Sequence, residues 1–194
     1  MKPAVCVVTG NAGKWAMAQA TMGDVLALER HALETPELQS LDVVEVARFS
    51  ALWAAKELGR PVLKTDVGYY VAALGGFPGP LVKWMNQTLE PADVLAMMVG
   101  KADRRMVIRE ALVYAEPGGF SMAVQVERPC TILAEVRDSV EGGSASVFDR
   151  IAQEDALPEP FASMTFEAQI AYLSRLVAPV YGDMAARIVE RAAA

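Results

Sequence analysis

Apolar and polar positions are segregated into blocks at the start of the chain. Residues 4–8 form a continuous apolar run rich in valine, and residues 9–13 form a turn that contains two glycines. A β-branched run bounded by a turn is typical of a strand that is buried on both faces, as in a parallel sheet. The pattern predicts a helix next, over about residues 14–28.

The second predicted helix has clear boundaries. Asp42 is a suitable N-cap, with Glu45 three residues later as in a capping box. Gly59 suits the left-handed position after a helix, and Pro61 prevents the helix from continuing. The inner face of this helix is expected to carry Val46, Phe49 and Trp53.

Short elements are predicted for the middle of the chain. Residues 61–67 form a strand in this interpretation, residues 75–80 a rigid glycine- and proline-rich turn, and residues 81–89 and 92–98 two short helices.

Two long extended stretches follow. Residues 104–115 and 120–136 are separated by Glu-Pro-Gly-Gly at 116–119, which predicts a long hairpin. Residues 138–146 are expected to form a loop, and a helix is expected from residue 165 onward. Its apolar stripe consists of Phe166, Ile170, Leu173 and Val177.

Strands that alternate with helices before a long hairpin indicate an α/β fold with a mixed central sheet. We expect one domain over residues 1–194, with two lobes around a central cleft.

Composition narrows the classes of partner. The 194 residues include 24 acidic and 18 basic side chains, a net charge of −6, and 53% are hydrophobic. The apolar fraction excludes a disordered chain, and the negative charge argues against nucleic acid as the main partner. The net charge does not exclude local binding of a small anion.

The two cysteines and the lengths of the apolar runs bear on location. Cys6 and Cys130 both lie in apolar, strand-like runs, so we expect buried thiols in a reducing compartment. No apolar run reaches the roughly 18 residues of a membrane span, and the first is too short for a signal peptide. The expected location is the cytoplasm, with no membrane partner.

The first turn, Thr9-Gly10-Asn11-Ala12-Gly13-Lys14, carries groups that suit phosphate binding. It combines backbone N–H groups at a helix start with hydroxyl, amide and ammonium donors. It is not a Walker A loop, because Val8 and Trp15 stand where that motif needs glycine and Ser or Thr. The alternative is a plain turn that needs Gly10 for its backbone and leaves Lys14 in solvent.

Two carboxylates are candidates for a metal site. Glu45 lies in the first turn of a predicted helix and Asp66 at the end of a predicted strand. Mg²⁺ is usually held by one or two carboxylates together with waters and substrate phosphates. The alternatives are a capping role for Glu45 and a turn-starting role for Asp66. His31 is the only histidine, which excludes a His-rich zinc site, and it is expected to lie on the surface.

Three segments together resemble the inosine triphosphate pyrophosphatase family. They are the first turn, Thr65-Asp66, and Ala73-Leu74-Gly75-Gly76-Phe77-Pro78-Gly79-Pro80-Leu81-Val82-Lys83-Trp84. Their order and spacing agree over essentially the whole chain. The resemblance implies a two-lobed, usually dimeric α/β enzyme that hydrolyses nucleoside triphosphates to monophosphate and pyrophosphate with Mg²⁺.

The resemblance also implies roles for residues at the phosphate end. Thr9, Asn11 and Lys14 match the family's phosphate-binding motif. Glu45 matches a metal-binding glutamate, and Asp66 matches the second acid of a paired-acid motif that binds metal and activates water. Asp66 and Lys14 are therefore the expected catalytic residues.

At the other end, the resemblance implies phosphate and base contacts. Lys83 and Trp84 match the segment that closes over the triphosphate, and Phe148-Asp149 resembles the end of the family's base loop. Near the C-terminus the family has a lysine and Ser-His-Arg that contact the base. The same spacing here gives Gln169, Ser174 and Arg175, so only the arginine is retained.

Two further departures concern the phosphate end. Thr65 stands where the family has its first acid, and Ser50 stands where it has a lysine. These departures leave three hypotheses: a pyrophosphohydrolase of the inosine and xanthine type, the same reaction with another base preference, and a nucleotide-binding or regulatory protein with weakened turnover. A purely structural partner protein, also expected to be dimeric, has the least support.

Overall fold

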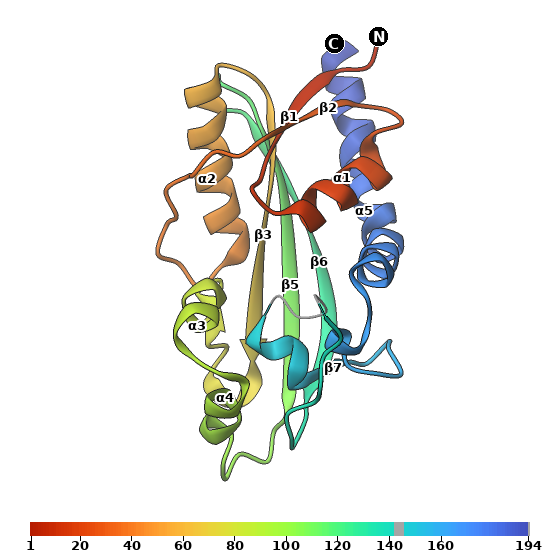
Figure 1. The fold of residues 1–194 in the computed structure, drawn as a ribbon. Helices are drawn as coiled ribbons and strands as arrows, with labels where there is room; N and C mark the ends of the chain where they lie inside the picture. Colours follow the sequence, from red (N-terminus) through yellow and green to blue (C-terminus); the bar gives the residue numbers. More distant parts are fainter. Residues whose placement is uncertain (142–145, 194) are drawn as a thin grey trace. The chain divides into compact units, whose positions relative to one another are not determined.

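A computed structural model describes residues 1–141 and 146–193 (Figure 1). In chain order the elements are β1 (Ala4–Val8), α1 (Ala12–Met22), β2 (Ala27–His31), α2 (Val43–Leu58), β3 (Val62–Val71), β4 (Pro78–Gly79), α3 (Val82–Thr88), α4 (Pro91–Met97), β5 (Arg105–Ala115), β6 (Ser121–Ile132), β7 (Ala152–Glu154) and α5 (Phe166–Ala193). Short 3-10 helices span Ala72–Leu74, Val147–Arg150 and Phe161–Ser163.

The strands form one mixed sheet in the order β2-β1-β3-β5-β6-β7, with β4 paired to β3. β1 is parallel to β2 and to β3, whereas β4 and β7 run antiparallel to their neighbours. The expected α/β fold with a mixed sheet is therefore confirmed.

The chain divides into two compact units. Unit 1 comprises Met1–Asp66, Glu110–Val126 and Ile170–Ala194, and unit 2 comprises Val67–Arg109 and Glu127–Gln169. Strands β3, β5 and β6 and helix α5 contribute residues to both units.

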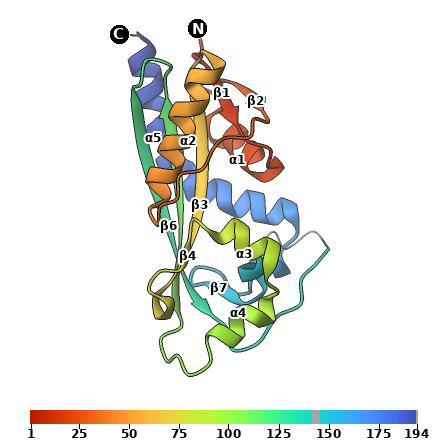
Figure 2. The same ribbon diagram turned by 90° about the vertical axis from the view of Figure 1, so that its left-hand side faces the viewer.

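Each unit has its own apolar core. In unit 1 the core joins buried residues of β1, α1, β5 and α5, among them Val5, Met22, Leu112, Tyr181 and Ile188. In unit 2 helices α3 and α4 contribute to a core with β5, β6 and the 3-10 helix Val147–Arg150. α4 contacts this 3-10 helix, and α3 and α4 follow one another along the chain (Figure 2). Both thiols, Cys6 and Cys130, are buried and free, as expected.

Several predicted boundaries are confirmed by the structure. β1 spans residues 4–8 as predicted, and the helices α3 and α4, the hairpin of β5 and β6 and the long α5 lie where they were expected. Helix α2 begins after Asp42, whose carboxylate accepts the N–H groups of Val44 and Glu45, and ends at Gly59 with φ 62°. The loop expected over residues 138–146 lies partly outside the described residues, because these omit 142–145.

The predicted first helix is too long. α1 ends at Met22, residues 23–26 form a turn, and residues 27–28, the last of the predicted helix, begin β2. β2 pairs in parallel with β1, with Val7 opposite Arg30. Its side chains are mostly exposed, so no alternating apolar pattern marked it as a strand.

Two predicted helix faces are wrong in part. On α2, Val46 is buried but Phe49 is 43% exposed, because the inner face is made of small residues such as Ala47, Ala51 and Ala54. On α5, Val177 is buried whereas Phe166, at the first position of the helix, is 43% exposed. None of the helices in the described part of the chain has the length and apolarity that a membrane crossing needs.

Candidate active site

The turn between β1 and α1 is organised by its own polar groups. The Asn11 side-chain oxygen accepts the N–H groups of Gly13 at 2.8 Å and Lys14 at 3.1 Å, and so caps α1. The Asn11 N–H donates to the Thr9 hydroxyl oxygen at 3.1 Å. Because both side-chain oxygens accept bonds within the turn, the Thr9 hydroxyl hydrogen, the Asn11 amide NH₂ and the Lys14 ammonium are the donors suited to an anion.

The structure does not require glycine at position 10. Its φ is not positive, and a Cβ atom built on it would meet no atom within 4 Å. The alternative in which the turn needs Gly10 for its backbone is therefore wrong.

Lys14 reaches across to β3. Its ammonium nitrogen lies 3.2 Å from the backbone oxygen of Thr65, and the side chain is partly buried rather than left in solvent. Asp66, the next residue, is also partly buried and lies within β3, which continues to Val71. The turn-starting alternative for Asp66 is therefore wrong, and the fold brings the lysine of the first turn beside the strand position of the candidate base.

Glu45 is exposed in the first turn of α2. Its carboxylate accepts a bond from the Ser40 hydroxyl at 2.7 Å. The Asp42 N–H, which a full capping box would pair with Glu45, donates to the Ser40 oxygen at 3.0 Å. Ser40 thus links the cap to Glu45 and leaves one carboxylate oxygen of Glu45 without a bond to Ser40.

No cluster of three or more His, Cys, Asp or Glu that could hold a metal occurs among residues 1–141 and 146–193. Mg²⁺ does not need such a cluster, because waters and substrate phosphates complete its coordination. Glu45 and Asp66 supply the oxygen donors that this ion prefers, so the donor chemistry fits a substrate-completed magnesium site.

Ser50, at the position of the family's lysine, is buried. It is 1% exposed, and its hydroxyl donates to the backbone oxygen of Pro36 at 2.9 Å. This residue ties the segment before α2 to the helix. The ammonium group of a lysine at this buried position would have no contact with solvent.

Helix α3 of unit 2 presents Lys83 and Trp84 at the surface. Trp84 is 57% exposed, and the Lys83 ammonium lies 5.7 Å from the centre of its ring. An exposed cation beside an exposed aromatic ring suits contact with an anionic ligand that carries a ring.

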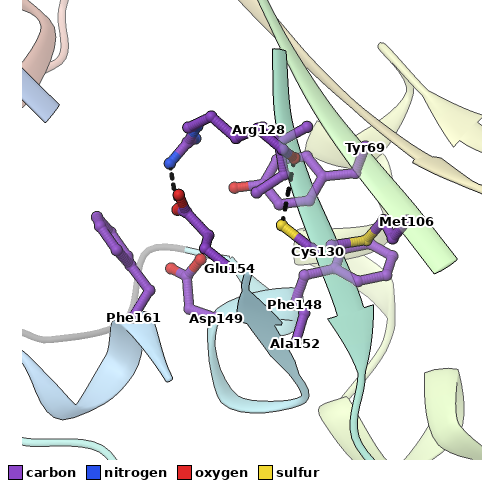
Figure 3. A pocket seen from close by; sticks show the side chains of 10 residues that line it. Tyr69, Met106, Arg128, Cys130, Phe148, Asp149, Ala152, Glu154 and Phe161 are labelled. Carbon is purple, nitrogen blue, oxygen red and sulfur yellow. Dashed lines mark hydrogen bonds and ion pairs between the residues drawn. The ribbon is translucent and has the colours of Figure 1, made fainter. Parts of the chain in front are cut away.

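Phe148 and Asp149 lie in the interior of unit 2. Phe148 is fully buried and stacks on Tyr69 with ring centres 5.1 Å apart (Figure 3). The Asp149 carboxylate accepts the Ser146 N–H at 2.9 Å. The pocket they line has a volume of about 20 Å³, enough for a water molecule but not for a nucleobase. Burial raises the pKa of the Tyr69 hydroxyl well above its usual range.

A buried ion pair borders the same pocket. Arg128 and Glu154 are 8% and 4% exposed and lie 2.5 Å apart, and the Cys130 thiol donates to the Arg128 backbone oxygen (Figure 3). Burial raises the pKa of Cys130 to about 12, so this thiol stays protonated at neutral pH. The sequence offered no signal for the ion pair, because its residues lie on separate strands, β6 and β7.

The remaining base-contact candidates all lie on α5 but differ in environment. The Gln169 amide nitrogen donates to the backbone oxygens of Phe161 at 3.1 Å and Met164 at 3.2 Å. The Ser174 hydroxyl oxygen is buried and makes no hydrogen bond within the described part of the chain, and Arg175 is exposed. Only Arg175 offers donors directly to solvent.

Comparison with known proteins agrees with the fold and the motifs. The chain is 34% identical over 137 residues to a dITP/XTP pyrophosphatase of Methanopyrus kandleri, which covers 70% of this chain and 69% of that protein. It is 33% identical over 166 residues to inosine triphosphate pyrophosphatase 1 of Trypanosoma cruzi, which covers 84% and 82%. The structure matches the Ham1 protein of Staphylococcus aureus with a TM-score of 0.74 at 18% identity, over 95% of this chain and 99% of that one.

The Ham1 family matches residues 5–179, a range that includes every candidate site residue named above. The resemblance that the three sequence segments suggested is thereby confirmed, and the chain belongs to the Ham1 family.

Proposed function

We propose that the chain is a nucleoside triphosphate pyrophosphohydrolase that cleaves between the α and β phosphates. Relatives named dITP/XTP pyrophosphatase and inosine triphosphate pyrophosphatase support this class of reaction. The observation that carries the proposal is the bond from the Lys14 ammonium to the Thr65 backbone oxygen, because it brings a phosphate-binding turn next to Asp66.

In this proposal the first turn holds the phosphates. Thr9 and Asn11 donate from their hydroxyl and amide groups, and the N-terminus of α1 adds a partial positive charge. Lys14 exchanges its bond to the Thr65 oxygen for one to a phosphate oxygen, and its charge offsets that of the β and γ phosphates. Lys83 on α3 is proposed as a further phosphate contact.

Asp66 is proposed as the general base. Its carboxylate accepts a proton from the attacking water as the oxygen of that water bonds to the α phosphorus. The bond from this phosphorus to the bridging oxygen then breaks, and pyrophosphate leaves. Lys14 and the helix N-terminus stabilise the negative charge that develops on the leaving group.

Asp66 and Glu45 are proposed to hold Mg²⁺, and the bound ion would neutralise charge on the triphosphate. Asp66 has the stronger support, because Lys14 already reaches its strand. Variants Glu45→Gln and Glu37→Gln, the latter at an exposed glutamate of the segment before α2, test the second ligand. The proposal expects the Mg²⁺ concentration for half-maximal rate to rise in Glu45→Gln alone, and a rise in Glu37→Gln alone would move the ligand to the segment before α2.

For the base we propose a preference for inosine and xanthine triphosphates over ATP that is weaker than in the family. Arg175 can donate to a 6-oxo group, but both donors of the Gln169 amide nitrogen already bind backbone oxygens. Ser174 has a shorter reach than the family's histidine and no charge. Phe148 is buried on Tyr69, so we assign Phe148 and Asp149 to the wall behind a base rather than to its first contact.

The experiment that tests the function is pyrophosphate release from ITP, XTP, dUTP, GTP and ATP, with and without Mg²⁺. The proposal expects release that depends on Mg²⁺. It also expects a kcat/KM that is higher for ITP than for ATP, with a ratio smaller than several orders of magnitude. Binding of a triphosphate without release of pyrophosphate in the presence of Mg²⁺ would favour the regulatory alternative. The departures from the family at Thr65 and Ser50 are the reason for considering that alternative.

We further propose that residues 1–194 act as one domain and assemble as a homodimer. Exposed apolar side chains such as Leu41 and Phe49 of unit 1 and Trp84 and Val99 of unit 2 are available to a partner copy. A single unfolding transition supports one domain. Light scattering at micromolar concentration that gives the monomer mass of 20.9 kDa would rule the dimer out.

A further inference from the structure

An arginine outside the recognised motifs is bonded to the first turn, residues 9–14, which is the phosphate turn of the proposed function. Arg30 lies on β2, and its guanidinium donates from Nε to the backbone oxygen of Thr9 at 3.2 Å and from Nη2 to that of Gly10 at 2.6 Å. The parallel pairing of β1 and β2 fixes its place, because the Thr9 N–H donates to the backbone oxygen of His31, the next residue, at 3.0 Å. The turn is thus held by its neighbouring strand through two consecutive peptide groups.

These bonds determine where the N–H groups of the same peptides point. In a planar trans peptide, the C=O of one residue and the N–H of the next point in opposite directions. Since Arg30 holds the oxygens of Thr9 and Gly10, the N–H groups of Gly10 and Asn11 point away from the guanidinium. The Asn11 N–H donates to the Thr9 hydroxyl, whereas the exposed Gly10 N–H makes no hydrogen bond to a described residue.

Arg30 also changes the charge that an anion meets at the turn. Carbonyl oxygens that faced a phosphate would repel it, and Arg30 holds two of them on its own side while adding a positive charge beside the turn. Glu29 does not cancel this charge at close range, because its carboxylate is paired with Arg60 at 2.8 Å. Glu29 and Arg30 are adjacent on β2, so their side chains also point to opposite faces of the sheet.

We propose that Arg30 is a positioning residue of the phosphate turn, which orients the Gly10 N–H toward a phosphate oxygen of the bound nucleotide. The inference rests on the proposed function, because it assigns Arg30 to the same phosphate site. Arg30 acts through the backbone and does not touch the substrate.

The first measurement is the affinity for inorganic pyrophosphate by calorimetry, together with KM and kcat for ITP. Arg30→Ala is expected to weaken pyrophosphate binding and raise KM about tenfold, the size of one lost hydrogen bond to a charged group, with a smaller change in kcat. Arg30→Lys is expected to recover part of the affinity, because it keeps the charge but lacks the planar fork. Arg187→Ala is the matched control, since Arg187 is an arginine of unit 1 that pairs with Asp183 on its own helix at 2.8 Å and does not bond to the turn.

The second measurement follows the Gly10 amide directly. In ¹⁵N-labelled wild type its cross-peak is expected to shift on addition of pyrophosphate, and in Arg30→Ala this shift is expected to shrink. A purely structural arginine would lower Tm and leave the affinity and the amide shift of the folded variant unchanged, and this result would overturn the inference. Wild type that neither binds pyrophosphate nor hydrolyses any triphosphate would overturn the proposed function as well.

Discussion

The phosphate turn of unit 1 and the segment Ser146–Arg150 of unit 2 are both capped turns, but they use their polar atoms differently. At the phosphate turn, Asn11 caps α1 with its oxygen and keeps its amide NH₂ for other partners. At the second segment, Ser146 and Asp149 cap each other's backbone and are both buried. The first turn therefore retains donors for a ligand, whereas the second uses its polar atoms to build its own unit.

This contrast explains why the family's phosphate-binding motif is a better guide to this chain than its base-contact residues are. Backbone donors at a helix start bind phosphate whatever the neighbouring side chains are, so a short motif is enough to mark them. A base contact depends on side chains that reach outward, and Phe148 and Gln169 instead face the interior of unit 2.

The largest expected effect tests the phosphate end through its acid. Asp66→Asn is expected to keep the fold and lower kcat about a thousandfold, because it removes both the proposed base and a charged ligand of the proposed metal. Pyrophosphate release under saturating ITP measures it, with Asp24→Asn, an exposed acid after α1, as the control. Activity near that of wild type would remove Asp66 from the mechanism.

The next effect tests whether the pocket that Asp149 of the second segment lines together with Glu154 belongs to a structural core. Glu154→Gln is expected to lower the free energy of unfolding by about 3 kcal/mol, because it leaves the Arg128 charge buried without its partner carboxylate. Urea unfolding measures this loss. The control is Glu127→Gln, whose surface pair with Arg109 at 2.9 Å is expected to contribute about 1 kcal/mol or less. Equal losses in the two variants would contradict the assignment of the buried pair to a structural core.

A smaller effect tests which phosphates the turn is proposed to contact. Lys14→Ala is expected to weaken triphosphate binding about thirtyfold, through the loss of a charge-assisted bond, and to affect monophosphate much less. Calorimetry with ITP and IMP in the absence of metal measures both affinities. Lys2→Ala serves as control, because Lys2 also donates to a backbone oxygen, that of Gly23 at 2.9 Å. Equal weakening for ITP and IMP would place Lys14 away from the β and γ phosphates.

The smallest effect probes the open space beside the Gly10 backbone. Gly10→Ala is expected to leave Tm unchanged, since the new methyl group meets no protein atom within 4 Å. It is expected to weaken pyrophosphate binding severalfold, because a methyl group there obstructs a phosphate that approaches the backbone. Gly118→Ala, at another open glycine, is the matched control. Unchanged affinity in Gly10→Ala would mean that the anion does not approach this backbone.

Elements with local signals were the predictable part of the fold. β1 had its valine run, and α2 had Asp42 and Gly59 at its ends, so both were located from neighbouring residues alone. β2 exists because its backbone pairs with β1, and β7 because its backbone pairs with β6. Such pairing leaves little trace in a short segment with exposed or mixed side chains.

The candidate site follows the same division. The motif residues Thr9, Asn11 and Lys14 lie within six positions of one another, and the family resemblance identified them directly. Arg30 has no motif, and its role emerges only when β2 is paired with β1. Phe49 shows the converse limit, because apolar spacing assigned it to the core, whereas the small alanines of α2 occupy that face.

Unit 1 is built from three separate stretches of chain, and this affects its folding during synthesis on the ribosome. Its core includes Val5 and Val7 of β1 together with Val177, Tyr181 and Ile188 of α5, more than 160 residues apart in the sequence. Long-range contacts of this kind slow folding and leave earlier segments exposed until their partners arrive. The strand that precedes the phosphate turn therefore acquires its full packing only after the ribosome has released α5. During translation β1 and its turn are expected to remain protease-sensitive, and a nascent chain without α5 is expected to bind pyrophosphate weakly or not at all.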